Sequence, residues 1–207
     1  MNKLTSLPFH TVLAQVAAPA PTPAGGAVAA LAGASGTALA EMVAALPRTR
    51  QNAAAERAAL EQVLPALTAA RARLEKLADL DVEAFERLLT AFRLPKGSDA
   101  EKTARRAAVT DATKDATLVP LETARTCADV LKLMETVADA GHRAAASDLF
   151  VGVSLVRAAA EGAAANVRAN LESLADPAFV LSSTRRLMAT LDDVTHSAHT
   201  ALGSLHG

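Results

Sequence analysis

Apolar residues recur along most of the chain at intervals of three and four, which is the spacing of one helical face. The clearest stripe lies over residues 60–77, and a second one follows over residues 82–92. Their apolar positions are Leu60, Val63, Leu64, Leu67, Leu74 and Leu77 in the first, and Val82, Phe85, Leu88, Leu89 and Phe92 in the second. No segment shows the sustained two-residue alternation, with β-branched or aromatic residues, that predicts a strand. The pattern therefore predicts an all-α protein.

Interruptions of this pattern divide the chain into about seven or eight helices. We expect a short helix over residues 4–16, an extended connector with prolines at 19, 21 and 23, and a helix over residues 25–46. Pro65 falls inside the next apolar stripe and predicts a kink, because proline removes a backbone donor. A turn, "LPKGSD", separates the second stripe from the following helix.

The second half of the chain carries clear helix start and stop signals. Ser98 and Glu101 have the spacing of a capping box, and Pro120 suits the first turn of a further helix that ends at Gly141. A long helix is expected over residues 147–174, and a last one begins at Asp176-Pro177 and ends near residue 202. With no repeat period, residues 1–207 are expected to form a single helical domain.

Small residues dominate the stretch "APAPTPAGGAVAALAGASGTALAEMVAALPRTR", residues 18–50. The whole chain of 207 residues is 51% hydrophobic, much of it alanine, with no Trp or Tyr and five Phe. Such a core must be filled by close packing of helices rather than by large aromatic anchors. The uncharged run ends at Glu41, short of the ~20 apolar residues that a membrane span needs, so we expect no membrane association.

Charge and cysteine content narrow the functional classes. A net charge of −1 gives no reason to expect nucleic acid or an anionic membrane as partner. The lone Cys127 excludes a disulfide framework and suits a reducing compartment, so we expect a cytoplasmic protein. His10 and Gln15 interrupt the apolar N-terminal stretch, which argues against a signal peptide. His196 and His199 lie one turn apart without a carboxylate pair nearby, so no metal site is expected.

One candidate for chemistry is Pro23-Ala24-Gly25-Gly26. A glycine pair entering a helix leaves amide donors free at its N-terminus and lets a flat ligand approach the backbone. The alternative is an ordinary proline–glycine turn before a tightly packed helix.

A second candidate is the segment from Gly141 to Gly152, in which Ser147 and Asp148 stand where a helix is expected to begin. Either Ser147 caps the helix and Asp148 complements its dipole, or Asp148 holds a cation or takes a proton from water. Further along this helix, Asn166 and Asn170 share one face and suggest a common ligand or a buried polar contact.

Four blocks in order carry a family resemblance: "PTPAGGAVAALAGASGTALAEMVAAL", "DVEAFERLLTAFRLPKGSDAEKTARRAAV", "DATLVPLETA" and "SDLFVGVSLVRAAAEGAAANVRANL". Across residues 21–180 the chain resembles the cyclodeaminase/cyclohydrolase family, which includes the C-terminal domain of formiminotransferase-cyclodeaminase and stand-alone methenyltetrahydrofolate cyclohydrolase. The resemblance implies a helical subunit that forms a homodimer and binds folate beside the glycine-rich helix start, with no cofactor.

The implied reaction is hydrolysis of methenyl-tetrahydrofolate, an amidinium cation, to the formyl form. On this reading Asp148 is the base or counter-ion, with Ser147 in the same catalytic segment. The implied substrate-binding residues are Pro23, Gly25, Gly26, Arg48, Arg50, Lys96, His142, Asn166 and Asn170, of which the three cations suit a polyglutamate tail. We therefore expect Gly25, Gly26, Ser147 and Asp148 to meet at one cleft.

The chain departs from the family pattern at several of these positions. Pro-Gly-Gly-Gly becomes Pro23-Ala24-Gly25-Gly26, Gly-Lys-Lys is replaced around residues 47–51, and Gly-Asn becomes Gly141-His142. Leu149 and Phe150 follow Ser-Asp where small residues are usual. Three readings stay open: a cyclohydrolase or the related formimino-tetrahydrofolate cyclodeaminase, a divergent member that acts on or binds another small molecule, and a purely structural helical dimer.

Overall fold

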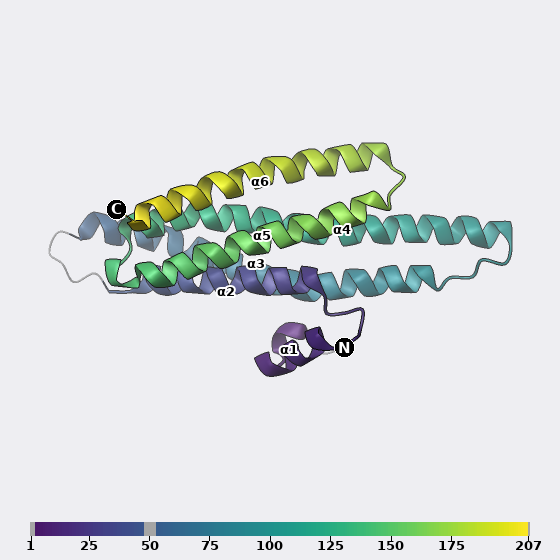
Figure 1. The fold of residues 1–207 in the computed structure, drawn as a ribbon, viewed down its shortest axis with the longest axis horizontal. Coiled ribbons are helices and arrows are strands. Elements are labelled where there is room, and N and C mark those ends of the chain that lie inside the picture. Colours follow the sequence, from purple (N-terminus) through teal and green to yellow (C-terminus); the bar gives the residue numbers. More distant parts are fainter. Residues whose placement is uncertain (1–2, 48–52, 207) are drawn as a thin grey trace.

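The computed structural model describes residues 3–47 and 53–206, and these form a bundle of long helices with no strand (Figure 1). The helices are η1 (Leu4–Ser6), α1 (Phe9–Ala17), α2 (Gly25–Ala45), α3 (Ala54–Phe92), α4 (Asp99–Ala140), η2 (Arg143–Ala145), α5 (Ala146–Glu172) and α6 (Pro177–His206), where η marks a 3₁₀ turn. The prediction of an all-α fold is confirmed.

The described ranges contain six α-helices instead of seven or eight, because helices continue where the sequence suggested breaks. The two apolar stripes join into the 39-residue α3, with Pro65 inside it. The capping box at Ser98 and Glu101 is present as predicted. The helix that it opens, α4, is 42 residues long and contains Pro120. The expectation that Pro120 begins a helix is therefore wrong. Packing along both halves of α4 outweighs the one hydrogen bond that proline removes.

Near the N-terminus the opposite happens, and the single helix expected over residues 4–16 is divided. The 3₁₀ turn η1 ends at Ser6, and α1 begins after Leu7 and Pro8. Asp79 of α3 holds η1 by accepting hydrogen bonds from the backbone N–H and the hydroxyl of Thr5. In Figure 1 this N-terminal arm lies beside the bundle, while the hairpin of α3 and α4 extends past the other helices.

Helix α2 lies against α3 and α5, and its small residues allow this close packing. A Cβ atom on Gly36 would lie 2.5 Å from the carbonyl oxygen of Gly152 in α5, so these two backbones are nearly in contact. Within the described ranges, α2 is the one helix long and apolar enough for a membrane span, and 56% of that apolar window is buried inside the bundle. A core helix of a bundle passes the same test of length and composition, and the burial of α2 is of this kind.

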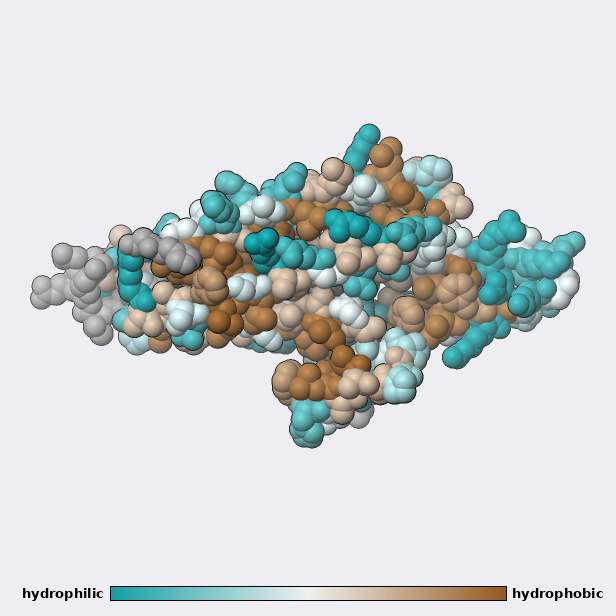
Figure 2. Space-filling view, in the orientation of Figure 1, coloured by the Kyte–Doolittle hydropathy of each residue, from teal (hydrophilic) through white to brown (hydrophobic). Residues whose placement is uncertain are grey.

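The hydropathy of the surface changes along the length of the bundle. Hydrophilic residues cover the projecting end of the α3–α4 hairpin, whereas apolar side chains gather on the arm and along the body (Figure 2). Large exposed apolar residues include Phe9 and Leu13 of α1, Met42 of α2, and Phe150 and Val151 of α5.

Candidate functional site

The start of α2 is capped by a residue from another helix. Ala24 occupies the N-cap position in an extended conformation, and its side chain makes no capping hydrogen bond. The carboxylate of Asp81 in α3 instead accepts a hydrogen bond from the backbone N–H of Ala27. The first amide groups of a helix lack partners within the helix and carry partial positive charge, so they attract a carboxylate.

Gly26 is required for this arrangement. A Cβ atom at this position would lie 2.6 Å from Cγ of Asp81 and would overlap its Oδ1 atom. Only a residue without a side chain leaves room for the carboxylate above the helix start. The glycine pair noted in the sequence therefore makes space for an acidic side chain.

Asp81 is largely buried, and burial raises the pKa of its carboxyl from 3.8 to about 6, although the hydrogen bond from Ala27 acts to lower it. No ion pair from the described residues reaches this carboxylate. A carboxyl with a pKa of about 6 is mostly ionised at neutral pH yet accepts a proton readily. That is the property expected of a general base.

A cavity of about 80 Å³ opens beside this carboxylate, lined by Thr22, Ala24, Gly26, Asp81, Phe85, Ala116, Asn166 and Asn170. The volume suits a few water molecules or the edge of a planar ring. Most of a larger ligand would therefore lie outside the cavity.

The two asparagines lie on one face of α5 and both line this cavity, as their spacing predicts. Nδ2 of Asn166 donates to the carbonyl of Gly162 at 2.9 Å, and the side chain lies beside Gly25. Nδ2 of Asn170 donates to the carbonyl of Ala116 in α4 at 2.8 Å. Each Nδ2 atom uses one of its two N–H groups in this way, so each side chain keeps an Oδ1 acceptor and one N–H donor.

Ser147 and Asp148 lie at the other end of the bundle. The N-terminal half of α2 packs against the C-terminal half of α5, as the contact between Gly162 and Ala29 shows. The eighteen residues from Asp148 to Asn166 span about 27 Å of helix. The prediction that Gly25, Gly26, Ser147 and Asp148 meet at one cleft is therefore wrong within a single chain, because antiparallel packing separates the two helix starts.

The start of α5 also differs from expectation. The N-cap of this helix is Ala145, without a side-chain capping bond, so Ser147 is not the cap. Asp148 is exposed and lies in the first turn, where a negative charge complements the helix dipole.

A second cavity, of about 390 Å³, lies near this end of α5, and its lining includes Val43, Val137, His142, Arg143 and Leu149. Nδ1 of His142 accepts a hydrogen bond from the backbone N–H of Ala144 at 3.2 Å. Ser147 and Asp148 are not among its lining residues. This cavity is larger than the first, and its lining also includes the carboxylates of Glu56 and Asp139.

The remaining predicted site residues are dispersed. Pro23 is buried immediately before the start of α2, and Lys96 is exposed in the turn between α3 and α4. Arg48 and Arg50 lie outside the described residues. In the described part of the chain, no group of three or more His, Cys, Asp or Glu side chains is placed to hold a metal ion.

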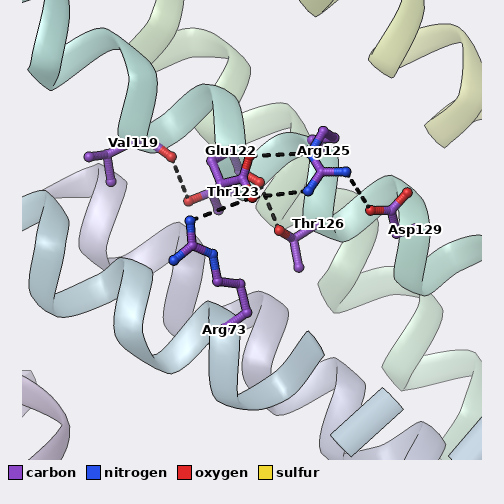
Figure 3. Close-up of polar contacts among 7 residues, drawn as sticks. All are labelled: Arg73, Val119, Glu122, Thr123, Arg125, Thr126 and Asp129. Atoms are coloured by element: carbon purple, nitrogen blue, oxygen red, sulfur yellow. Dashed lines mark hydrogen bonds and ion pairs between the residues drawn. The ribbon is translucent and has the colours of Figure 1, made fainter. Parts of the chain in front are cut away.

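Another acidic side chain between α3 and α4, Glu122 of α4, is held in ion pairs (Figure 3). Arg73 of α3 approaches Glu122 at 3.6 Å, and Arg125 binds it at 3.0 Å while also contacting Asp129 at 3.2 Å. Hydrogen bonding and the charge of Arg125 lower the pKa of Glu122. This carboxylate is neutralised and joins α3 to α4, so among these groups Asp81 is the better candidate for proton transfer.

Sequence reasoning missed Asp81, although a signal was present. Leu74, Leu77, Asp81, Phe85 and Leu88 follow one another at three- and four-residue spacings, so the aspartate occupies a position in the apolar stripe of α3. A carboxylate at a core-facing position is uncommon unless it is paired or functional. The same residue also opens the "DVEAF" block that carries much of the family resemblance.

Comparisons with known proteins find relatives that match most of the chain. The family model described as formiminotransferase-cyclodeaminase matches residues 8–189. A methenyltetrahydrofolate cyclohydrolase from Methylorubrum extorquens is 40% identical over 88% of this chain and 88% of its own length. A formimidoyltransferase-cyclodeaminase from Sus scrofa is 33% identical over 99% of this chain, which spans 38% of that relative.

A solved structure extends the match to the whole fold. The crystal structure of formiminotetrahydrofolate cyclodeaminase from Thermotoga maritima has a TM-score of 0.89 and 28% identity, and it covers 99% of this chain and 98% of its own. With the family model matching most of the chain, and this relative folding in the same way, the protein belongs to the formiminotransferase-cyclodeaminase family.

Proposed function

We propose that this protein is an enzyme that hydrolyses methenyl-tetrahydrofolate to formyl-tetrahydrofolate. The observation that carries the proposal is the buried carboxylate of Asp81, with a pKa of about 6, facing a small polar cavity at the start of α2. The relative that matches nearly the full length of this chain is named for the same reaction.

The reaction needs a base, a site for the cation and a proton for the departing nitrogen. Asp81 accepts a proton from water as the oxygen bonds to the bridging carbon of the amidinium, and its negative charge stabilises that cation beforehand. The carbon–nitrogen bond to the ring then breaks as the proton held by Asp81 passes to the ring nitrogen. The hydroxyl group of the intermediate loses its proton to solvent as it becomes the formyl carbonyl. Atoms balance, since one water is consumed and one proton is released overall.

Other cavity residues have roles that follow from their hydrogen bonds. The Oδ1 atoms of Asn166 and Asn170 can accept from N–H groups of the heterocycle, because one hydrogen bond from each Nδ2 atom to a carbonyl holds the side chain in place. The open backbone at Gly25 leaves space for a flat ring to approach the helix start. Lys96 and the predicted cations Arg48 and Arg50 are candidates for the polyglutamate tail.

The second candidate is formimino-tetrahydrofolate cyclodeaminase activity, in which ammonia is the leaving group. The likeness to the Thermotoga maritima cyclodeaminase over the whole fold favours it. The same carboxylate could donate its proton to the departing nitrogen, so both reactions use one site.

A homodimer is part of the proposal. Met42 of α2 and Phe150 and Val151 of α5 expose large apolar side chains on adjacent helices. Ser147 and Asp148 of one chain can contribute to the Asp81 cavity of the other in a dimer whose twofold axis passes near the middle of α2 and α5, with these helices antiparallel across it. The reduced, buried Cys127 suits the cytoplasm, where we place the protein.

The test is loss of the methenyl absorbance when purified protein is mixed with methenyl-tetrahydrofolate, compared with buffer alone. A parallel assay measures ammonia released from formimino-tetrahydrofolate. We expect the wild type to accelerate the first reaction and Asp81→Asn to abolish the effect. Glu83→Gln, at an exposed carboxylate two residues away on α3, is the matched control and should retain full rate. A wild type that accelerates neither reaction would contradict the proposal.

A further inference from the structure

Pro120 leaves a gap in the hydrogen bonding of α4 that a side chain from α5 fills. In a regular helix, the N–H of residue 120 would donate to the carbonyl of Ala116, but proline has no N–H. Nδ2 of Asn170 is 2.8 Å from that carbonyl oxygen and donates to it across the helix interface. The amide of Asn170 thus replaces the backbone donor that Pro120 lacks.

This contact lies at the wall of the Asp81 cavity. Ala116 is buried, and both Ala116 and Asn170 line the cavity. A buried carbonyl without a donor is costly, so the gap in α4 favours the conformation in which Asn170 points its nitrogen at Ala116. The side chain is then held in one orientation, with its Oδ1 atom available as an acceptor for a bound molecule.

Pro65, the other proline inside a long helix, shows that a side-chain donor from another helix is not a general consequence of a proline in a helix. Pro65 interrupts α3 in the same way and leaves the carbonyl of Glu61 without its helical donor. Pro65 and Glu61 are both exposed, so water reaches that carbonyl, and no hydrogen bond from another described helix is made to it. Pro65 and Pro120 therefore make the same change in helical hydrogen bonding but differ in the burial of the carbonyl affected, so Pro65 serves as the control for Pro120.

We infer that Pro120 and Asn170 are a positioning pair for the ligand of this cavity. Pro120 acts through Asn170: by leaving the Ala116 carbonyl open, it holds the side chain so that Oδ1 accepts a hydrogen bond from an N–H of a nitrogen heterocycle bound beside Asp81. This inference rests on the proposed function for the identity of the heterocycle, but the pairing itself does not depend on it.

The pairing is tested by stability, without any ligand. Asn170→Ala should lower the Tm of the wild type, because the Ala116 carbonyl loses its donor. In a Pro120→Ala background the same change should have little effect, because the new N–H of residue 120 satisfies that carbonyl. Equal losses of Tm in the two backgrounds would overturn the inference. If Asn170→Ala alone fails to fold, folding of the double variant supports the pairing, and failure of the double variant, with Pro120→Ala folded, contradicts it.

The positioning role is tested by kinetics on methenyl-tetrahydrofolate. Pro120→Ala should fold at least as stably as the wild type yet raise KM about ten-fold with kcat little changed, as expected for loss of one hydrogen bond used in binding. Pro65→Ala should leave both constants at wild-type values. An unchanged KM in Pro120→Ala would refute the role. A wild type inactive on both folates would refute the proposed function, while the stability cycle would still decide the pairing.

Discussion

Replacing Asp81 by Asn should make the protein more stable and catalytically inactive. The carboxyl titrates near 3.8 in the unfolded chain and near 6 in the fold, because burial disfavours its charged form. Since the folded pKa is the higher one, the folded state is free of this penalty below pH 4, loses stability between pH 4 and 6, and carries the full penalty above. A shift of about two units corresponds to roughly 3 kcal/mol in the free energy of unfolding.

Asparagine removes this penalty with little change of shape. Its Oδ1 atom can still accept from the N–H of Ala27, so the cap at the start of α2 is retained. We therefore expect Asp81→Asn to raise the free energy of unfolding by about 2–3 kcal/mol at pH 8 and by much less at pH 4. The rate of hydrolysis should fall about 10²–10⁴-fold, the usual effect of removing a general base.

The measurement is denaturant unfolding of both proteins at pH 4 and pH 8, together with turnover of methenyl-tetrahydrofolate at pH 8. Glu83→Gln removes an exposed charge from the same helix and should change neither quantity appreciably. A variant that is less stable than the wild type at pH 8 would refute the buried, unpaired state of Asp81. A variant of full activity would refute its catalytic role.

Three further outcomes are expected. Gly26→Ala should lower the free energy of unfolding by about 1–3 kcal/mol and reduce turnover, because the new Cβ displaces Asp81. Gly203→Ala is the control and should be neutral or slightly stabilising, because its new Cβ meets open space. Asp148→Asn should shift stability by less than about 1 kcal/mol but slow turnover if a second chain brings this carboxylate to the cavity, and unchanged kcat would leave it only a helix-dipole role. Mixed, refolded Asp81→Asn and Asp148→Asn subunits should recover about a quarter of wild-type activity if each site takes one residue from each chain, and none if both belong to one chain.

Local sequence patterns determined the helical fold of this protein. The three- and four-residue spacing of apolar positions predicted helices throughout, and the capping box at Ser98 placed the start of α4 correctly. The glycine pair placed the start of α2. These features are readable because periodicity and capping depend on residues within one or two turns of each other.

Tertiary packing decided which helices continue through prolines. Pro65, where a kink is predicted, lies inside α3, and Pro120, where a helix start was expected, lies inside α4. At Pro120 the missing donor comes from Asn170, a residue far along the chain, so no local rule could reveal it.

Sequence and tertiary packing each determined part of the candidate site. The sequence indicated Gly26, Asn166 and Asn170, which line one cavity, and Gly25, which lies beside Asn166, but it assigned the carboxylate to Asp148. The antiparallel packing of α2 on α5 sets Asp148 about 27 Å along the helix from Asn166, and the packing of α3 on α2 brings Asp81 over Gly26 instead. Spacing along one helix fixes which residues share a face, whereas the residue that meets that face from another helix is fixed only when the helices pack.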